Sequence, residues 1–167
     1  EGFVSDHQAR DFQASASLAL DADGRFLALR IRSAANVGAY VAGAAVSVQT
    51  FQYPTAPGGL YDIPCIAMDI SAVLSHTVPV GVTRGPGFAE ALNVLERLVD
   101  KAATQCGFDR FELRRRNLVP TGRMPWTNAM GTRIDSGDFP ALMNETLANA
   151  DWAGFEARRQ EAAARGK

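Results

Sequence analysis

The N-terminal part of the sequence alternates apolar and polar residues in a way that is typical of β-strands. In the run SASLALDADGRFLALRIRS, apolar side chains recur at every second position on both sides of the segment Asp-Ala-Asp-Gly. Asp23 and Gly24 in that segment tolerate the left-handed backbone conformation that tight hairpin turns require. The pattern predicts a β-hairpin, in which this turn joins two antiparallel strands.

The residues after the hairpin give three separate signals. The run NVGAYVAGAAVSVQT is rich in Ala, Val and Gly, and its weak alternation fits a strand and a helix equally well, so its structure stays open. Residues 54–64, PTAPGGLYDIP, hold three prolines and two adjacent glycines and are predicted to form a loop. In CIAMDISAVLS the apolar residues Ile66, Met68 and Ile70 alternate with smaller or polar ones, which predicts another strand.

From Phe88 onward the spacing of the apolar residues becomes helical. Gly107 is placed to end this helix in a left-handed conformation. Asp109 and Glu112 have the spacing of a capping box, which begins a short second helix that reaches about Asn117. The apolar face of the first helix is predicted to carry Leu92, Leu95, Leu98, Val99, Ala102 and Cys106.

The C-terminal part is predicted to hold two more helices after an extended or irregular connection, VPTGRMPWTNAMGTRIDSG. Asp138 and Asp151 each precede a helical pattern and are predicted to cap it, and Pro140 is tolerated in a first helical turn. The order of elements predicts the α+β class without internal repeats. Within residues 1–167 we expect a strand-rich part at 1–83, a connecting loop at 84–87 and a helical part at 88–167.

Composition and charge narrow the function classes. The chain has 167 residues, of which 47% are hydrophobic and 21% charged, as in ordinary soluble domains. The formal net charge of −1 gives no basis for binding nucleic acid or an anionic membrane surface. No apolar run is long enough to predict a membrane-spanning helix. The chain opens without an initiator methionine or a signal peptide, and both ends are expected to be cut from a longer polypeptide.

The residues that usually bind metals are scattered. Cys65 and Cys106 belong to no Cys-x-x-Cys motif, and we expect them to be reduced, buried thiols of a cytoplasmic protein. His7 and His76 are isolated and are expected to be structural or surface residues. The spacing therefore predicts no zinc or iron–sulfur centre held by this chain.

The segment Arg84-Gly85-Pro86-Gly87 is the strongest candidate for a functional site. It matches neither the dinucleotide-binding glycine fingerprint nor the P-loop. Glycines allow the backbone to approach another group closely, and the free N–H groups at the start of the following helix favour an anion or an oxygen-rich ligand. Arg84 adds a permanent charge and five hydrogen-bond donors. From residue chemistry alone, a plain strand-to-helix corner and a ligand-facing turn both remain open.

The other candidate features are interpreted as structural. In the run LRRRNL, at least one arginine is expected to tie its helix to neighbouring carboxylates or backbone carbonyls. Trp126, Trp152 and Phe155 are expected to be core or interface residues. A self-contained anion-binding module that uses the turn at Arg84 is one possible function for the chain.

Four collinear runs of this sequence resemble a known family. ALDADGRFLALRIRSAANVGAY, VPVGVTRGPGFAEALNVLERLVDKAA, FELRRRNLVP and IDSGDF are together similar to the molybdopterin-binding large subunit of the xanthine dehydrogenase and aldehyde oxidase family. The similarity is closest to the carbon monoxide dehydrogenase large-chain branch and covers almost the whole chain. Because the family is much longer, the resemblance implies an internal piece of a molybdenum-cofactor-binding domain.

The resemblance implies roles for the residues of the turn. It implies that Arg84, Gly85 and Gly87 form a cofactor-binding loop beside the oxygen ligands of molybdenum, and that Pro86 and Phe88 line the substrate side. Carbon monoxide dehydrogenases carry a copper-binding cysteine immediately after this arginine. Since Gly85 stands at that position here, we expect a hydroxylase of aldehydes or N-heterocycles with water as the oxygen source.

The resemblance also implies a catalytic residue, a cofactor and partners that lie outside residues 1–167. The catalytic glutamate of the family lies beyond Lys167, so no catalytic residue is expected in this chain, which should be inactive by itself. The implied cofactor is molybdopterin in its cytosine dinucleotide form. The implied partners are an iron–sulfur subunit or domain, an FAD subunit or domain, a small-molecule substrate and a second copy in a homodimer. The alternative from another class is a non-catalytic assembly or interaction domain.

Overall fold

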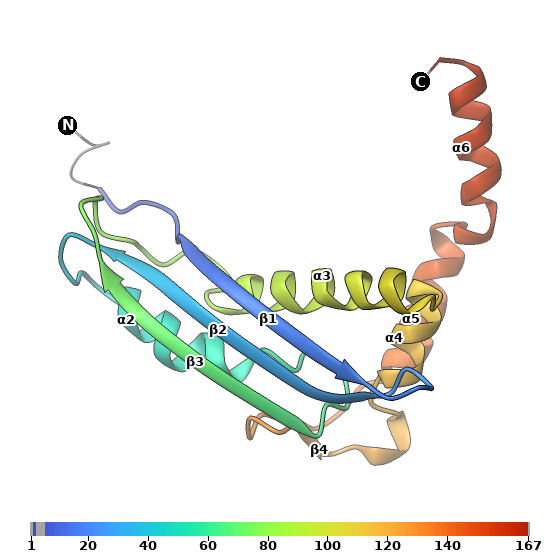
Figure 1. The fold of residues 1–167 in the computed structure, drawn as a ribbon, viewed down its shortest axis with the longest axis horizontal. Coiled ribbons are helices and arrows are strands. Elements are labelled where there is room, and N and C mark those ends of the chain that lie inside the picture. Colours follow the sequence, from blue (N-terminus) through green and yellow to red (C-terminus); the bar gives the residue numbers. More distant parts are fainter. Residues whose placement is uncertain (1, 3–5, 167) are drawn as a thin grey trace.

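A three-stranded sheet forms one layer of the computed structural model, which describes residue 2 and residues 6–166 (Figure 1). The strands β1 (Phe12–Leu20), β2 (Phe26–Gly38) and β3 (Cys65–Leu74) lie in the order β1-β2-β3. β1 and β2 are antiparallel and pair Leu18 with Leu29, which confirms the predicted hairpin. β3 is the strand predicted from alternation, and it runs parallel to β2.

The turn of the hairpin is held by a residue that the sequence pattern did not single out. The carboxylate of Asp21 accepts hydrogen bonds from the backbone N–H groups of Asp23 and Arg25, at 2.9 and 2.8 Å. Gly24 adopts the predicted left-handed conformation, with φ of 80°. Asp21 thus forms an Asx-type turn that closes the hairpin from its first residue.

The segment left open by its weak alternation divides into two structures. Its first residues extend β2 as far as Gly38, and later ones form the short helices α2 (Ala45–Ser47) and η1 (Val48–Gln52). A 3-10 turn, η2 (Tyr53–Thr55), covers the first residues of the predicted loop, and the remainder of that loop contains no helix or strand. These short helices cross the sheet side that also carries α3 (Figure 1).

The predicted long helix is α3 (Phe88–Cys106), which lies along the inner side of the sheet and ends at Gly107, whose φ is 75° (Figure 1). Burial of apolar side chains between these two layers supplies most of the driving force for folding. The core consists of Phe26, Leu29, Ile31, Tyr53, Ala56, Tyr61, Ile63, Ala91, Leu95, Val99, Ala102, Ala103 and Leu113.

The prediction of which residues form the apolar face of α3 is confirmed in part. Leu95, Val99 and Ala102 are buried, but Leu92 is 42% exposed and Cys106 is exposed. The buried face instead includes Ala91 and Ala103, because these small residues let the helix approach the sheet closely. The prediction of buried thiols is wrong for both cysteines: Cys106 is the last helical residue, and Cys65 begins an edge strand.

The second predicted helix, α4 (Arg110–Asn117), begins with half of the expected capping box. The Asp109 carboxylate accepts hydrogen bonds from the N–H groups of Phe111 and Glu112 at 2.9 and 2.8 Å. The Glu112 carboxylate binds Arg115 instead of returning to the cap. Asp109 thus satisfies two of the N–H groups that a helix start leaves free.

Asp109→Ala is expected to lower the free energy of unfolding by about 1 kcal/mol, because two N–H groups of the first helical turn lose their acceptor. Urea denaturation followed by circular dichroism measures the change. Asp135→Ala is a matched control, because the Asp135 carboxylate accepts only from the neighbouring Ser136 hydroxyl. Equal losses for the two variants would contradict the assignment of Asp109 as a cap.

The arginines of α4 bind neighbouring groups as predicted. Arg114 forms ion pairs with Glu96 and Asp100 at 2.7 and 2.8 Å. Arg115 donates to Asn144 at 3.0 Å, and Arg116 donates to the backbone carbonyl of Asp23. These contacts tie α4 to α3, to the hairpin turn and to the C-terminal helices.

The predicted irregular connection contains a 3-10 turn and two very short strands, η3 (Thr121–Arg123), β4 (Trp126–Thr127) and β5 (Arg133–Ile134). Helix α5 (Phe139–Asn149) follows. Asp138 caps it as predicted, since its carboxylate accepts from the N–H of Ala141 at 3.0 Å. Trp126 is buried, as expected for a core residue.

The predicted cap at Asp151 is wrong. Asp151 adopts a left-handed conformation with φ of 45°, and its carboxylate binds Arg158 rather than a helix N–H group. The chain continues through η4 (Trp152–Gly154) into α6 (Phe155–Ala164), which projects away from the sheet (Figure 1). The Trp152 and Phe155 rings stack at 4.8 Å between centroids and stay partly exposed.

Candidate functional site

The segment that leads to the candidate turn is fixed to the end of the sheet. Val80 is buried and pairs with Gln8 in a parallel bridge, and its N–H donates to the carbonyl of Val37 at 3.4 Å. The N–H of Gly81 donates to the carbonyl of Gln8 at 3.0 Å. The chain therefore enters residues 84–87 from a backbone held by both the N-terminal segment and β2.

The two glycines of the turn differ in what surrounds them. Both have positive φ, 72° at Gly85 and 80° at Gly87. A Cβ atom on Gly87 would lie 2.5 Å from the backbone nitrogen of Tyr53, whereas a Cβ on Gly85 would meet no atom of the described residues within 4 Å. The close approach predicted for this turn is thus found at Gly87, where it is made to the chain's own backbone. Gly85 leaves open space on the outer side.

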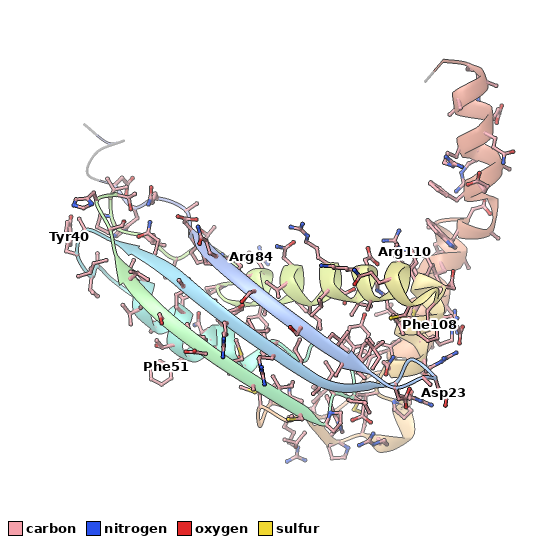
Figure 2. The ribbon with its side chains drawn as sticks, viewed as in Figure 1. Asp23, Tyr40, Phe51, Arg84, Phe108 and Arg110 are labelled. Carbon is pink, nitrogen blue, oxygen red and sulfur yellow. The ribbon has the colours of Figure 1, made fainter. Side chains whose placement is uncertain are left out.

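The remaining residues of the turn line that open side. Arg84 is exposed, and Figure 2 shows it close to where α3 begins. Pro86 is half-buried, and the Phe88 side chain is 48% exposed. Within residue 2 and residues 6–166, no hydrogen bond or ion pair engages the Arg84 guanidinium. Arg84, Gly85 and Phe88 are brought together as an accessible surface, and Gly87 supports them from below.

The start of α3 adds hydrogen-bond donors to this surface. Its N-cap residue is Gly87, which has no side chain to accept from the first helical N–H groups. The carbonyl of Gly85 accepts from the Ala89 N–H at a long 3.3 Å. A helix start without a side-chain cap carries partial positive charge that favours anionic groups. Together with the five donors of Arg84, it can bind an oxygen-rich anionic ligand.

A buried polar cluster lies beneath the turn, and sequence reasoning missed it. Arg10 forms an ion pair with Glu90 in the first turn of α3, and the two side chains are only 12% and 8% exposed. Tyr53 and Ser33 are buried close by. Burial raises the pKa of the Tyr53 hydroxyl, the nearby Ser33 hydroxyl lowers it, and the charge of Glu90 raises it further. No sequence signal marks the cluster, because its members come from four distant segments.

The residue types that bind metals are not gathered in the described part of the chain. Across residue 2 and residues 6–166, no group of three or more His, Cys, Asp or Glu side chains is arranged to hold an ion. His7 and His76 are both exposed, as surface residues. No helix of the described part is long and apolar enough to cross a bilayer.

Comparison with known proteins adds independent observations. The model of the molybdopterin cofactor-binding domain family matches residues 1–118. The chain is 33% identical over 158 residues to the 6-hydroxypseudooxynicotine dehydrogenase complex subunit gamma of Paenarthrobacter nicotinovorans, covering 92% of this chain and 20% of the relative. It is 32% identical over 157 residues to the carbon monoxide dehydrogenase large chain of Hydrogenophaga pseudoflava, covering 90% of this chain and 19% of the relative.

The fold is similar to that of a solved enzyme. Quinoline 2-oxidoreductase from Pseudomonas putida 86 superposes on 98% of this chain with a TM-score of 0.89 and 34% sequence identity, over 21% of its own chain. The present chain thus spans about a fifth of the length of the curated relatives it matches. The similarity includes the turn at residues 84–87, which lies inside the region matched by the family model.

Proposed function

The chain belongs to the molybdopterin cofactor-binding domain family, and from this premise we propose that it supplies one wall of the cofactor site of a molybdenum-dependent oxidoreductase. The observation that best supports this proposal is the open space on the outer side of the turn. There Arg84 is exposed, and a Cβ on Gly85 would meet nothing within 4 Å. This leaves room for a bulky ligand beside five guanidinium donors and an uncapped helix start.

The residues present fit the chemistry of such a cofactor. Molybdopterin, when bound, supplies a metal centre that takes two electrons from the substrate. The Arg84 guanidinium would donate hydrogen bonds to oxygen atoms at that centre and stabilise negative charge there. Gly85 would let the backbone come close to the ligand. Gly87 keeps the turn in place through its packing on Tyr53, and Pro86 and Phe88 would border the substrate.

The proposed substrates are aldehydes or N-heterocycles. Support comes from Gly85, which cannot supply the thiolate that a copper site at this position would need. It also comes from a relative and a structural neighbour whose names refer to a pseudooxynicotine and to quinoline. Since the catalytic glutamate is expected outside residues 1–167, residues 1–167 by themselves should lack activity.

The form of the cofactor, the partners and the location of the protein are also proposed. We propose the cytosine dinucleotide form of the cofactor, an iron–sulfur and an FAD subunit or domain as electron-transfer partners, and a homodimer. One relative is named as a subunit of a dehydrogenase complex, which supports assembly with other chains. A cytoplasmic location stays a prediction, and the free thiols of Cys65 and Cys106 are compatible with it.

The longer protein that contains this chain, purified with its co-expressed partners, is expected to hold about one molybdenum per large chain by elemental analysis. Arg84→Met should reduce turnover of the best aldehyde or heterocycle substrate roughly tenfold to thirtyfold, the effect of losing a charge-assisted hydrogen bond. Arg97→Met, at an exposed position of α3, is the matched control and should change neither the molybdenum content nor the turnover.

Molybdenum-free wild-type protein, obtained under conditions that load a known member of the family, would contradict the proposal. It would favour the alternative of a non-catalytic assembly domain. Unchanged turnover in Arg84→Met with full molybdenum content would contradict the role given to Arg84, but not the proposed function of the chain.

A further inference from the structure

We propose that Arg10 and Glu90 are positioning residues, which hold the turn at residues 84–87 in shape from inside and keep the Arg84 guanidinium turned outward. This proposal rests on the proposed function for its purpose at the cofactor. Its structural content, a buried clamp on the turn, can be tested without the cofactor.

The contacts of Arg10 join the two ends of the turn. Its Nε atom donates to Oε1 of Glu90, and one of its terminal nitrogens donates to the backbone carbonyl of Thr83 at 3.5 Å. Thr83 immediately precedes Arg84, and Glu90 lies in the first turn of the helix that follows Gly87. One guanidinium therefore fixes both the entry to the turn and the helix that leaves it.

Because the pair is buried, stability alone does not explain why these two residues are charged. The side chains of Arg10 and Glu90 are 12% and 8% exposed. Oε2 of Glu90, the Tyr53 hydroxyl and the Ser33 hydroxyl are buried without a hydrogen-bond partner among the residues that the structure describes. Apolar residues of similar volume would stabilise such a place at least as well as a buried ion pair does. The polar pair instead gives the turn one defined geometry, because its hydrogen bonds are directional.

The pair also affects the electrostatics of Arg84. Glu90 is a negative charge only six positions from Arg84, at the positive end of α3. Arg10 neutralises this carboxylate from the inner side. Without Arg10, the uncompensated carboxylate would attract the Arg84 guanidinium inward and compete with an outer ligand. Removing Arg10 should thus disturb the turn more than removing both charges together.

Hydrogen exchange measured by mass spectrometry on the full-length protein, free of molybdenum, tests the clamp directly. In Arg10→Gln we expect the amides of Ala89 and Ala91, which donate to carbonyls of the turn, to exchange at least tenfold faster, with smaller changes in β2 and the C-terminal half of α3. Arg10→Gln/Glu90→Gln should lie closer to wild type than Arg10→Gln, and Arg10→Lys should restore part of the protection. Arg123→Gln, which breaks an exposed ion pair with Asp62, is the control.

Uniformly faster exchange across the whole domain, or exchange of the Ala89 and Ala91 amides equal to that of the Arg123→Gln control, would overturn the proposal. If Arg10→Gln does not fold, the isosteric Glu90→Gln variant serves the same comparison. In the molybdenum-loaded protein the clamp predicts a shifted paramagnetic-resonance spectrum for Arg10→Gln. Wild-type protein that takes up no molybdenum under loading conditions, together with the expected exchange pattern in Arg10→Gln, would refute the proposed function and leave the clamp standing. If the wild-type protein binds molybdenum but Arg10→Gln changes neither the exchange pattern nor the paramagnetic-resonance spectrum, the clamp is refuted.

Discussion

Gly87→Ala is expected to lower the free energy of unfolding by about 3–5 kcal/mol, a large part of the total stability of a domain. The residue has φ of 80°, a conformation that costs a non-glycine residue about 1–2 kcal/mol. Its new Cβ would also lie 2.5 Å from the Tyr53 nitrogen and 2.9 Å from the carbonyl carbon of Gln52. Both are backbone atoms, so η2 or α3 must shift to relieve the overlap.

Gly85→Ala is the control for this prediction within the same turn. Gly85 has a similar φ of 72°, but its Cβ would meet no atom within 4 Å. The alanine therefore has only the conformational cost of about 1–2 kcal/mol. Urea denaturation of both variants separates packing from backbone strain. Equal losses would show that Gly87 is not a packing contact. A loss of molybdenum by Gly85→Ala, without a large loss of stability, would instead support ligand approach at that residue.

Asn117→Ala is expected to destabilise the protein by about 3–5 kcal/mol as well, although the side chain is polar. The amide is 3% exposed and connects the hairpin to α4. Its Nδ2 donates to the carbonyls of Gly24 and Leu113, and its Oδ1 accepts from the Phe26 N–H, each at 2.8 Å. Truncation leaves the buried Phe26 N–H and the Gly24 carbonyl without their side-chain partner, and each such loss costs about 1–3 kcal/mol.

Asn144→Ala provides the matched comparison, because Asn144 is exposed and only accepts from Arg115 at 3.0 Å. Its cost should stay below about 0.5 kcal/mol. Thermal and urea unfolding give both values. A cost for Asn117→Ala as small as that of Asn144→Ala would mean that water replaces the lost amide. Asn117→Asp should resemble the alanine variant, because a carboxylate cannot donate to the two carbonyls.

The parts of the fold that the sequence predicted are those governed by local periodicity. The hairpin, β3 and α3 show clear twofold or helical spacing, and their caps at Gly107, Asp109 and Asp138 use residues with few alternative roles. The parallel pairing of β3 with β2 and the helices at 45–55 depend on tertiary contacts, so local pattern left them open. Asp151 failed as a cap because Arg158, seven positions further on, binds its carboxylate.

The candidate site was predictable only in its outer half. The turn at Arg84 could be selected as a candidate from the sequence, because two glycines around a proline precede a helical pattern, but residue chemistry alone left a plain strand-to-helix corner equally open. The inner half is assembled from Arg10, Ser33, Tyr53 and Glu90, which no spacing rule connects. Burial of an arginine and a glutamate also contradicts the usual preference of charged residues for the surface.

The contact between Arg10 and Glu90 joins positions 80 residues apart in the sequence. Closing a chain segment of that length has an entropic cost that must be met before the contact contributes any stability. Contacts of such long range are made late in folding, after local hairpins and helices have formed. The turn at Arg84 should therefore acquire its final shape in the last stages of folding, and a cofactor that requires this shape would be inserted into an already folded chain rather than serve as the nucleus around which it folds.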